Sequence, residues 1–342
     1  MAGLILLAVI AALGWKLRAP AGLVWGTLAI LWGAFVLVHG LFPGPGHPLP
    51  ALIGGSLPGW IGLGVVAALV QAYRWALARL RARAVVPEAP IEGPFSKAEL
   101  GRYSRHLLLR EIGGTGQRRL KSARVLVVGA GGLGSPALLY LSAAGVGTLG
   151  VIDHDAVSNS NLQRQVLYRD DDIGKPKVFA AAAALTALNP FITVRPYHRR
   201  LTEDIAADLI AEYDLVLDGC DDFETRQLVN RACVTAGKPL ISAAISQWEG
   251  QISLYHPASG GPCLACLFPH APAPGLAPSC AEGGVMAALP GILGTMMAAE
   301  AIKEITGAGT PLRGKLQLID ALHGENRTIA VCRDPACPVC GG

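Results

Sequence analysis

A dense group of polar side chains follows the second strand that this sequence predicts. The group is Ser160-Asn-Leu-Gln-Arg-Gln165, and Gly174-Lys-Pro-Lys177 opens the helix after it. A lysine in the first turn of a helix is disfavoured by the helix dipole, so Lys177 suggests an anionic ligand. Attack on a phosphate builds negative charge on its oxygens, which nearby cations stabilise. Arg164 and Lys177 therefore indicate phosphate chemistry.

A glycine-rich turn joins the first predicted strand to a helix, in Val125-Leu-Val-Val-Gly-Ala-Gly-Gly-Leu-Gly134. Such glycines let backbone N–H groups approach a phosphate, and the helix N-terminus adds partial positive charge. Asp153 ends the next strand nineteen residues past Gly134, where a carboxylate can accept hydrogen bonds from a ribose. On these features alone an NAD- or FAD-binding oxidoreductase is favoured. Arg164 and Lys177 reverse that preference, because hydride transfer has little use for two cations in a nucleotide pocket.

A later strand ends in carboxylates, in Asp214-Leu-Val-Leu-Asp-Gly-Cys-Asp-Asp222. Parallel sheets bind ligands at the carboxyl ends of their strands, so Asp221 is expected beside the nucleotide. A carboxylate that faces a triphosphate suits a Mg²⁺ ion. Capping of the following helix is the alternative role for an aspartate here, and Asp222 can fill it.

All eight cysteines lie after residue 200, and four of them form two C-x-x-C pairs, Cys263/Cys266 and Cys337/Cys340. Four thiolates suit tetrahedral Zn²⁺ with no open position for chemistry. The pairs are separated by 70 residues, so a metal would pin the C-terminus onto the domain. We expect a structural zinc knuckle over 263–340.

Cys280 stands apart, in a glycine-flanked segment after a proline-rich crossover. A cysteine in such a segment could accept an acyl group or carry a persulfide, so we keep it as a candidate catalytic residue. The remaining thiols, Cys220, Cys233 and Cys332, are expected to pack as ordinary side chains.

The elements that must position these groups alternate between strand and helix. Strands are predicted at 124–128, 148–152, 192–195, 214–217, 239–243 and 251–255, and helices near 134–144, 177–188, 204–212 and 224–236. Short β-branched runs separated by helices indicate a Rossmann-like α/β fold, with a mostly parallel sheet covered on both faces. Ser96 and Glu99 form a capping-box pattern that should open a helix reaching about residue 110.

Residues 1–84 are expected to form a transmembrane anchor. Asp and Glu are absent from 1–87, and apolar stretches lie near 2–15, 21–42 and 51–73. The second would span about 33 Å as a helix, enough for a hydrocarbon core of about 30 Å. The first is short, so two spans remain the alternative to three. A linker at 85–94 then leads to a catalytic domain over 95–342.

Charge orients this anchor. The first hundred residues carry seven basic and three acidic side chains, which accounts for the net charge of +4. If all three stretches cross, the basic clusters fall on one side, and the positive-inside rule puts the catalytic domain on the cytoplasmic side of an inner or cell membrane. A cleaved signal peptide is the competing interpretation, but it lacks a basic n-region. No basic stripe is interleaved with aromatic residues, so nucleic-acid binding is not expected.

The ordered set of motifs resembles the MoeB/ThiF/HesA family, relatives of the ubiquitin-activating enzymes. The resemblance runs from about Phe95 to the C-terminus, covers none of the anchor, and is closest to the MoeB type. It rests on Arg102-Tyr-Ser-Arg105, Gly129-Ala-Gly-Gly-Leu-Gly134, Asn161-Leu-Gln-Arg-Gln165, Gly174-Lys-Pro-Lys177, Cys220-Asp-Asp222 and the two C-x-x-C pairs.

The resemblance implies roles for individual residues. Arg164 and Lys177 would lie nearest the transferred α-phosphate, and Asp221 would hold Mg²⁺. Because the family works as a homodimer, Arg105 would reach into the ATP site of the partner subunit. Asp222 departs from the pattern, since the resembling bacterial enzymes commonly have asparagine there. The implied ATP-binding residues are Gly129, Gly131, Gly132, Gly134, Asp153, Asn161, Arg164, Gln165 and Lys177.

The activity implied is adenylation of the C-terminal glycine carboxylate of a ubiquitin-like sulfur-carrier protein ending in Gly-Gly, with release of pyrophosphate. The favoured carrier is the small subunit of molybdopterin synthase, and the thiamine-pathway carrier is the alternative. A separate sulfur-donor protein would then act on the adenylate. Two alternatives from other classes are a membrane-bound NAD-dependent oxidoreductase and a non-catalytic docking platform for a carrier.

Overall fold

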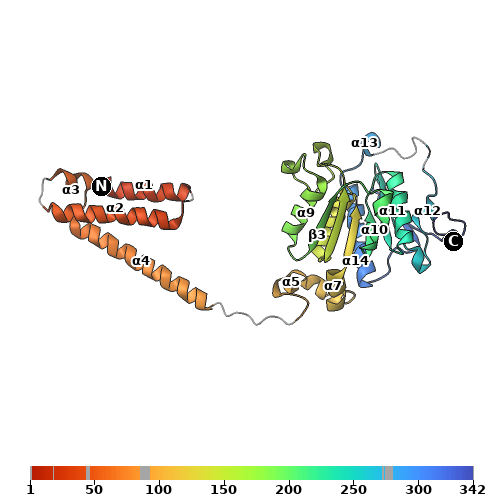
Figure 1. Ribbon diagram of the computed structural model, residues 1–342, viewed down its shortest axis with the longest axis horizontal. Helices are drawn as coiled ribbons and strands as arrows, with labels where there is room; N and C mark the ends of the chain where they lie inside the picture. The colour runs from red at the N-terminus through yellow and green to blue at the C-terminus, as the bar shows by residue number, and fades with distance from the viewer. Residues whose placement is uncertain are drawn as a thin grey trace. The chain divides into compact units, whose positions relative to one another are not determined.

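The computed structural model describes residues 2–17, 19–43, 47–84, 93–271, 273 and 280–341, which fall into two compact units, Met1–Pro90 and Ile91–Gly342 (Figure 1). Residues 85–92 of the predicted linker, most of the proline-rich crossover and the side chain of Cys280 lie outside the described part. The boundary between the units falls within the predicted linker at 85–94.

The first unit is helical. Two of its segments, Gly22–Leu41 and Leu57–Arg79, are long and apolar enough to cross a membrane by length and composition alone. The third predicted span, 51–73, is not one helix, because Gly54 and Gly55 adopt φ values of 75° and 88° that end a helix. The helices are α1 (Ala2–Lys16), α2 (Ala21–Leu41), α3 (Pro48–Ile53) and α4 (Leu57–Ala84).

The second unit is built on one eight-stranded sheet with the order β3-β2-β1-β4-β5-β6-β7-β8. The first five strands are parallel, as the sequence predicts, and β6 to β8 are antiparallel. The strands are β1 (Arg124–Val128), β2 (Thr148–Asp153), β3 (Thr193–His198), β4 (Leu215–Asp218), β5 (Leu240–Ser246), β6 (Glu249–Tyr255), β7 (Lys315–Asp320) and β8 (Glu325–Ala330). The last two were not predicted.

Helices cover both faces of this sheet, as expected. Alternate residues of β1 enter different cores: Val127 packs with α8 (Gly134–Ala144), α9 (Lys177–Leu188) and α14 (Leu289–Thr306), whereas Leu126 packs with α10 (Glu203–Ala211) and α11 (Phe223–Thr235). Among these, α14 was not predicted. The remaining helices of this unit are α5 (Lys97–Arg102), α6 (Ser104–Leu107), α7 (Gly113–Ser122), α12 (Leu264–Leu267), α13 (Cys280–Gly283) and the 3₁₀ turns η1 (Asn159–Asn161), η2 (Asp170–Asp172) and η3 (Pro257–Ser259).

The Ser96–Glu99 capping box is present, but the helix that it opens stops at Arg102. Tyr103 interrupts the helix because its ring is buried and its hydroxyl accepts a hydrogen bond from Asn189 Nδ2 at 2.9 Å. The ring packs so closely on Gly145 that a Cβ there would lie 2.5 Å from it. Burial of this ring takes precedence over the continuous helix to about residue 110 that the sequence predicts.

Candidate functional site

A pocket of about 840 Å³ opens at the carboxyl ends of β1, β2 and β4, the edge at which parallel sheets bind ligands. Its volume falls within the range of about 300–1,000 Å³ that is usual for ligand sites. Among the residues predicted to bind nucleotide or metal, the pocket is lined by Gly129, Gly131, Gly132, Asp153, Asn161, Arg164, Gln165, Lys177 and Asp221.

The glycines of the turn between β1 and α8 serve different purposes. Gly129 has φ 89°, and a Cβ on it would lie 3.0 Å from the carbonyl oxygen of Gly219. A Cβ on Gly134 would lie 1.9 Å from the carbonyl oxygen of Gly129, so this residue closes the turn and does not line the pocket. Gly131 meets only Gln165 Nε2, at 3.7 Å. The first two are therefore required by the fold, and Gly131 leaves room for a ligand.

Asp153 fastens the loop to the next strand. Its Oδ2 accepts the backbone N–H of Ala130 at 2.8 Å, and its Oδ1 accepts that of Asp155 at 2.8 Å. Each carboxylate oxygen keeps a second lone pair. The geometry thus allows the predicted ribose contact while giving Asp153 a structural role as well.

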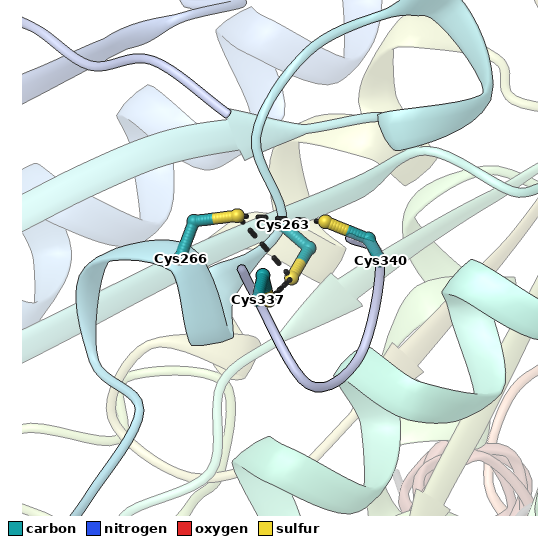
Figure 2. Close-up of side chains that lie close together, drawn as sticks. All are labelled: Cys263, Cys266, Cys337 and Cys340. Atoms are coloured by element: carbon teal, nitrogen blue, oxygen red, sulfur yellow. Dashed lines mark hydrogen bonds between the residues drawn. The ribbon is translucent and has the colours of Figure 1, made fainter. Parts of the chain in front are cut away.

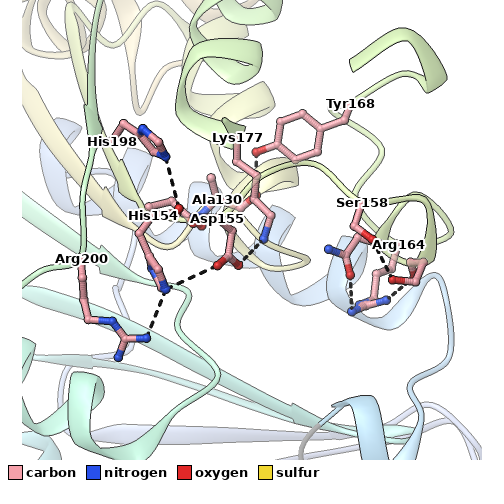
Figure 3. Close-up of polar contacts among 12 residues, drawn as sticks. Ala130, His154, Asp155, Ser158, Arg164, Tyr168, Lys177, His198 and Arg200 are labelled. Atoms are coloured by element: carbon pink, nitrogen blue, oxygen red, sulfur yellow. Dashed lines mark hydrogen bonds and ion pairs between the residues drawn. The ribbon is translucent and has the colours of Figure 1, made fainter. Parts of the chain in front are cut away.

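Lys177 is buried, with 4% of its surface exposed, and its ammonium donates to Asp155 Oδ2 at 2.8 Å (Figure 3). Burial raises the pKa of Asp155, but the hydrogen bond and charge of Lys177 outweigh it and leave this pKa below its usual value. The Asp155 carboxylate is therefore ionised at neutral pH, and its interaction with Lys177 weakens as pH falls through the lowered pKa of Asp155. Sequence reasoning missed Asp155, although its position two residues after Asp153 could have signalled it.

Arg164 and Gln165 also line the pocket. Arg164 donates to the carbonyl oxygen of Ser160 and to Asn161 Oδ1, both at 3.1 Å (Figure 3). Gln165 is 3% exposed, and its Oε1 has no hydrogen-bond partner among the described residues. An unsatisfied buried amide costs about 1–3 kcal/mol, and a bound polar ligand would relieve that cost. The donor set and this amide fit a nucleotide.

The two neighbouring aspartates divide the roles expected of them. Asp221 is exposed at the pocket, and within the described part of the chain its carboxylate makes no hydrogen bond or ion pair. Asp222 is the N-cap of α11, because its Oδ1 accepts the N–H of Thr225 at 2.7 Å. Asp221 therefore keeps oxygens free for a cation, and Asp222 does not need to bind one.

Replacing Asp222 by alanine is expected to lower the free energy of unfolding by about 1 kcal/mol, the usual contribution of an N-cap. Because Asp222 is occupied with the helix, the Mg²⁺ concentration needed for half-maximal ATP binding should stay within twofold of the wild-type value. Chemical denaturation and ATP titration measure the two quantities. A large change in Mg²⁺ requirement with unchanged stability would contradict the assignment.

Two predicted residues lie outside the pocket. Arg105 is exposed on α6, and Gly134 is buried at the start of α8. The backbone of Cys280 begins α13, but its thiol is not among the described side chains. Besides Asp155, sequence reasoning also missed Arg199 and Arg226, which line the pocket from the loop after β3 and from α11.

The four cysteines of the predicted knuckle come together (Figure 2). Cys263 Sγ lies 3.6 Å from Cys337 Sγ, and Cys266 Sγ lies 3.8 Å from Cys263 Sγ and 3.4 Å from Cys340 Sγ. Tetrahedral Zn²⁺ with Zn–S bonds of about 2.3 Å requires sulfur separations of about 3.8 Å, so the donor set fits zinc. Of the other thiols, Cys233 is buried and Cys220 partly so, as expected, but Cys332 is exposed because it lies just past the edge strand β8.

The cysteine cluster adjoins the pocket through α12, which begins directly after Cys263 and contains Cys266. Leu264 and Leu267 of this helix line the pocket. The N–H of Leu264 donates to Asn230 Oδ1 at 2.9 Å, and Gln227 Nε2 donates to the carbonyl oxygen of Phe268 at 2.7 Å. Both acceptor and donor side chains belong to α11. Loosening of the knuckle should therefore disturb one wall of the pocket.

Comparison with known proteins identifies relatives of the second unit. Residues 103–339 match the model of the ThiF family. A sulfur carrier protein adenylyltransferase of Thermus thermophilus is 51% identical over 72% of this chain and 93% of its own length. The probable adenylyltransferase/sulfurtransferase MoeZ of Mycobacterium tuberculosis is 50% identical and the adenylyltransferase and sulfurtransferase MOCS3 of Mus musculus 49% identical, but this chain spans only 63% and 57% of their lengths.

Solved structures with the same architecture include Escherichia coli MccB. MccB with MccA-N7isoASN has a TM-score of 0.64 and 26% identity, over 74% of this chain and 77% of that one. MccB with ATP has a TM-score of 0.62 and 27% identity, over 70% and 75%. These likenesses support the fold.

Proposed function

Since this chain belongs to the ThiF family and is a nucleotidyltransferase of that type, we propose that it uses ATP to adenylate the C-terminal carboxylate of a ubiquitin-like sulfur-carrier protein. The observation that carries the proposal is that two cations, the buried Lys177 and Arg164, line one pocket together with the glycine turn after β1. The names of the relatives support an adenylyltransferase over the oxidoreductase alternative.

In the proposed reaction the carrier carboxylate attacks the α-phosphate of ATP, an acyl-adenylate forms, and pyrophosphate leaves. A terminal carboxylate is ionised at neutral pH, so no protein base is required. Lys177 and Arg164 would stabilise the negative charge that builds on the phosphate, and the glycine loop would position it. Asp221 would hold Mg²⁺, which supplies Lewis-acid charge neutralisation when it is bound.

The carrier that we favour is the small subunit of molybdopterin synthase, with the thiamine-pathway carrier as the alternative. The support is the MoeB-like run from Arg102 to Gln165. A separate sulfur-donor protein would convert the adenylate to a thiocarboxylate. Cys280 would act in that later step as an acyl acceptor or persulfide carrier, and it belongs to the segment that follows the pocket-lining residues Phe268 to His270.

We also propose that the enzyme is a homodimer in which Arg105 completes the ATP site of the partner subunit. Arg105 is exposed and does not reach the pocket of its own chain. The exposed side chains of Leu108 and Leu109, which follow it, offer apolar surface for such a contact. The docking-platform alternative would need neither this arginine nor Arg164.

The helical unit is proposed to anchor the enzyme in an inner or cell membrane, with the second unit in the cytoplasm. Ile30, Leu37 and Leu69 are each at least 60% exposed on α2 and α4, as lipid-facing side chains would be. The full chain is expected to stay in the membrane pellet after alkaline carbonate washing, whereas a variant lacking residues 1–84 should be released. Release of the full chain by carbonate would argue against the anchor.

The direct test of the activity is mass spectrometry of candidate carriers after incubation with the full chain and MgATP. The expected result is an added AMP on one carrier, and ATP–pyrophosphate exchange that depends on that carrier. A carrier without its terminal glycine is the matched control and should gain no mass. Retention of NAD by the purified protein, with no AMP on any carrier, would favour the oxidoreductase alternative instead.

A further inference from the structure

A buried charge network lies beneath the loop that carries Asp221. Asp218, the last residue of β4, is fully buried, and its Oδ1 accepts the N–H of Cys220 at 3.0 Å. Its Oδ2 accepts the hydroxyl of Ser242 on β5 at 2.6 Å. The carboxylate therefore ties two neighbouring strands to the first turn of the loop, directly before Asp221.

Arg226 closes this network from the first turns of α11. Its Nη1 lies 3.6 Å from Asp218 Oδ2 and donates to Ser242 Oγ at 3.3 Å, and its Nη2 donates to the carbonyl oxygen of Cys220. The guanidinium thus donates two hydrogen bonds and forms an ion pair at once, in a planar fork that the compact ammonium of a lysine does not reproduce. Both backbone polar groups of Cys220 are thereby fixed.

The charges around Arg226 distinguish two roles for it, direct contact with a phosphate and positioning of the loop that carries Asp221. Its side chain lines the nucleotide pocket but is only 14% exposed, and the carboxylate that it faces is 0% exposed. A buried carboxylate needs a partner, since an unpaired buried charge costs several kcal/mol. Most of the positive charge of Arg226 is therefore matched by Asp218, in contrast to Arg164, whose guanidinium donates to the carbonyl oxygen of Ser160 and the side-chain oxygen of Asn161.

We infer that Arg226 is a positioning residue: with Asp218 and Ser242 it holds the Cys220–Asp221 backbone so that the exposed Asp221 carboxylate faces the nucleotide-bound divalent cation. This inference rests on the proposed nucleotide site. The loop also packs on the glycine turn, because a Cβ on Gly129 would lie 3.0 Å from the carbonyl oxygen of Gly219. The network thus sets the position of Asp221 relative to the glycine turn.

The test is calorimetric titration of the full chain with ATP, in metal-free buffer and with Mg²⁺. Arg226→Lys keeps the charge beside Asp218 but loses the fork. It is expected to weaken MgATP binding about tenfold while changing ATP binding without metal less than twofold. Ser242→Ala removes one member of the network and should weaken MgATP binding by about threefold. This second variant keeps the inference testable if Arg226→Lys folds poorly.

Arg313→Lys is the matched control. Arg313 is likewise bonded to a carboxylate, Glu304, and to a serine hydroxyl, Ser259, but it lies outside the nucleotide pocket. Its variant should leave both titrations unchanged. Equal losses of ATP and MgATP affinity in Arg226→Lys would overturn the inference in favour of direct phosphate contact, and unchanged MgATP binding would overturn it outright. A wild-type affinity that does not depend on Mg²⁺ would also overturn it.

These titrations need no carrier, so their outcome is separate from that of the proposed activity. If the wild type binds MgATP but transfers AMP to no carrier, the proposed function fails and the positioning role stands. If AMP is transferred and Arg226→Lys binds MgATP normally, the function stands and the positioning role fails.

Discussion

Replacing Lys177 by alanine is expected to lower the rate of AMP transfer by about 10²–10³-fold, the usual effect of removing one fixed donor that faces developing charge. Lys177 is the most buried cation of the pocket wall, and its ammonium is already oriented by Asp155. Because Asp155 is half exposed, it can be solvated once the lysine is gone, and the fold should survive. Single-turnover transfer of AMP at saturating ATP measures the effect.

Lys175→Ala is the matched control for this experiment. Lys175 belongs to the same Gly-Lys-Pro-Lys motif, but its ammonium is exposed and pairs with Asp172 at 2.9 Å, away from the pocket. Its loss should change the rate less than twofold. A variant that lacks both Arg164 and Lys177 yet adenylates the carrier at the wild-type rate would refute the proposed chemistry.

Loss of metal from the cysteine cluster is expected to cost on the order of 5 kcal/mol of stability, since structural zinc contributes about 10–16 kcal/mol in small peptides. For a domain of this size such a loss corresponds to a fall in Tm of about 10–20 °C. Cys337→Ser should show it in calorimetry, together with weaker ATP binding, because α12 lines the pocket through Leu264 and Leu267.

The control is Cys332→Ser, which alters an exposed thiol in the same C-terminal segment. Its Tm and bound zinc, measured by elemental analysis, should equal those of the wild type. If Cys337→Ser keeps both its zinc and its Tm, the cysteines do not hold a structural metal. If it loses zinc but binds ATP normally, the coupling between knuckle and pocket is wrong.

The predictable part of the fold is the part with strong local signals. The residues 134–144 and 177–188 form helices with the predicted bounds, because one follows a glycine turn and the other begins directly after Pro176. In contrast, β8 carries Glu325, Asn326 and Arg327 and is exposed throughout, so it has no apolar alternation to reveal it. The strand forms because β7 provides hydrogen-bonding partners for it. No pattern within residues 325–330 indicates that pairing.

The same distinction applies to the site. Residues predicted from the sequence, such as Asp153, Arg164 and Lys177, line the pocket and follow the glycine turn along the chain. Asp155 and Arg226 were missed because their importance comes from partners 22 and 8 positions away, Lys177 and Asp218, that only the folded chain brings close. Such pairs are set by tertiary packing and not by motif spacing.

The ion pair between Lys177 and Asp155 also bears on selectivity. Before any nucleotide arrives, the charge of this lysine is already balanced within the protein. A free phosphate or sulfate ion, attracted by charge alone, therefore gains little from Lys177, whereas a nucleotide also makes ribose and base contacts. Simple anions should accordingly compete poorly with the nucleotide for this lysine.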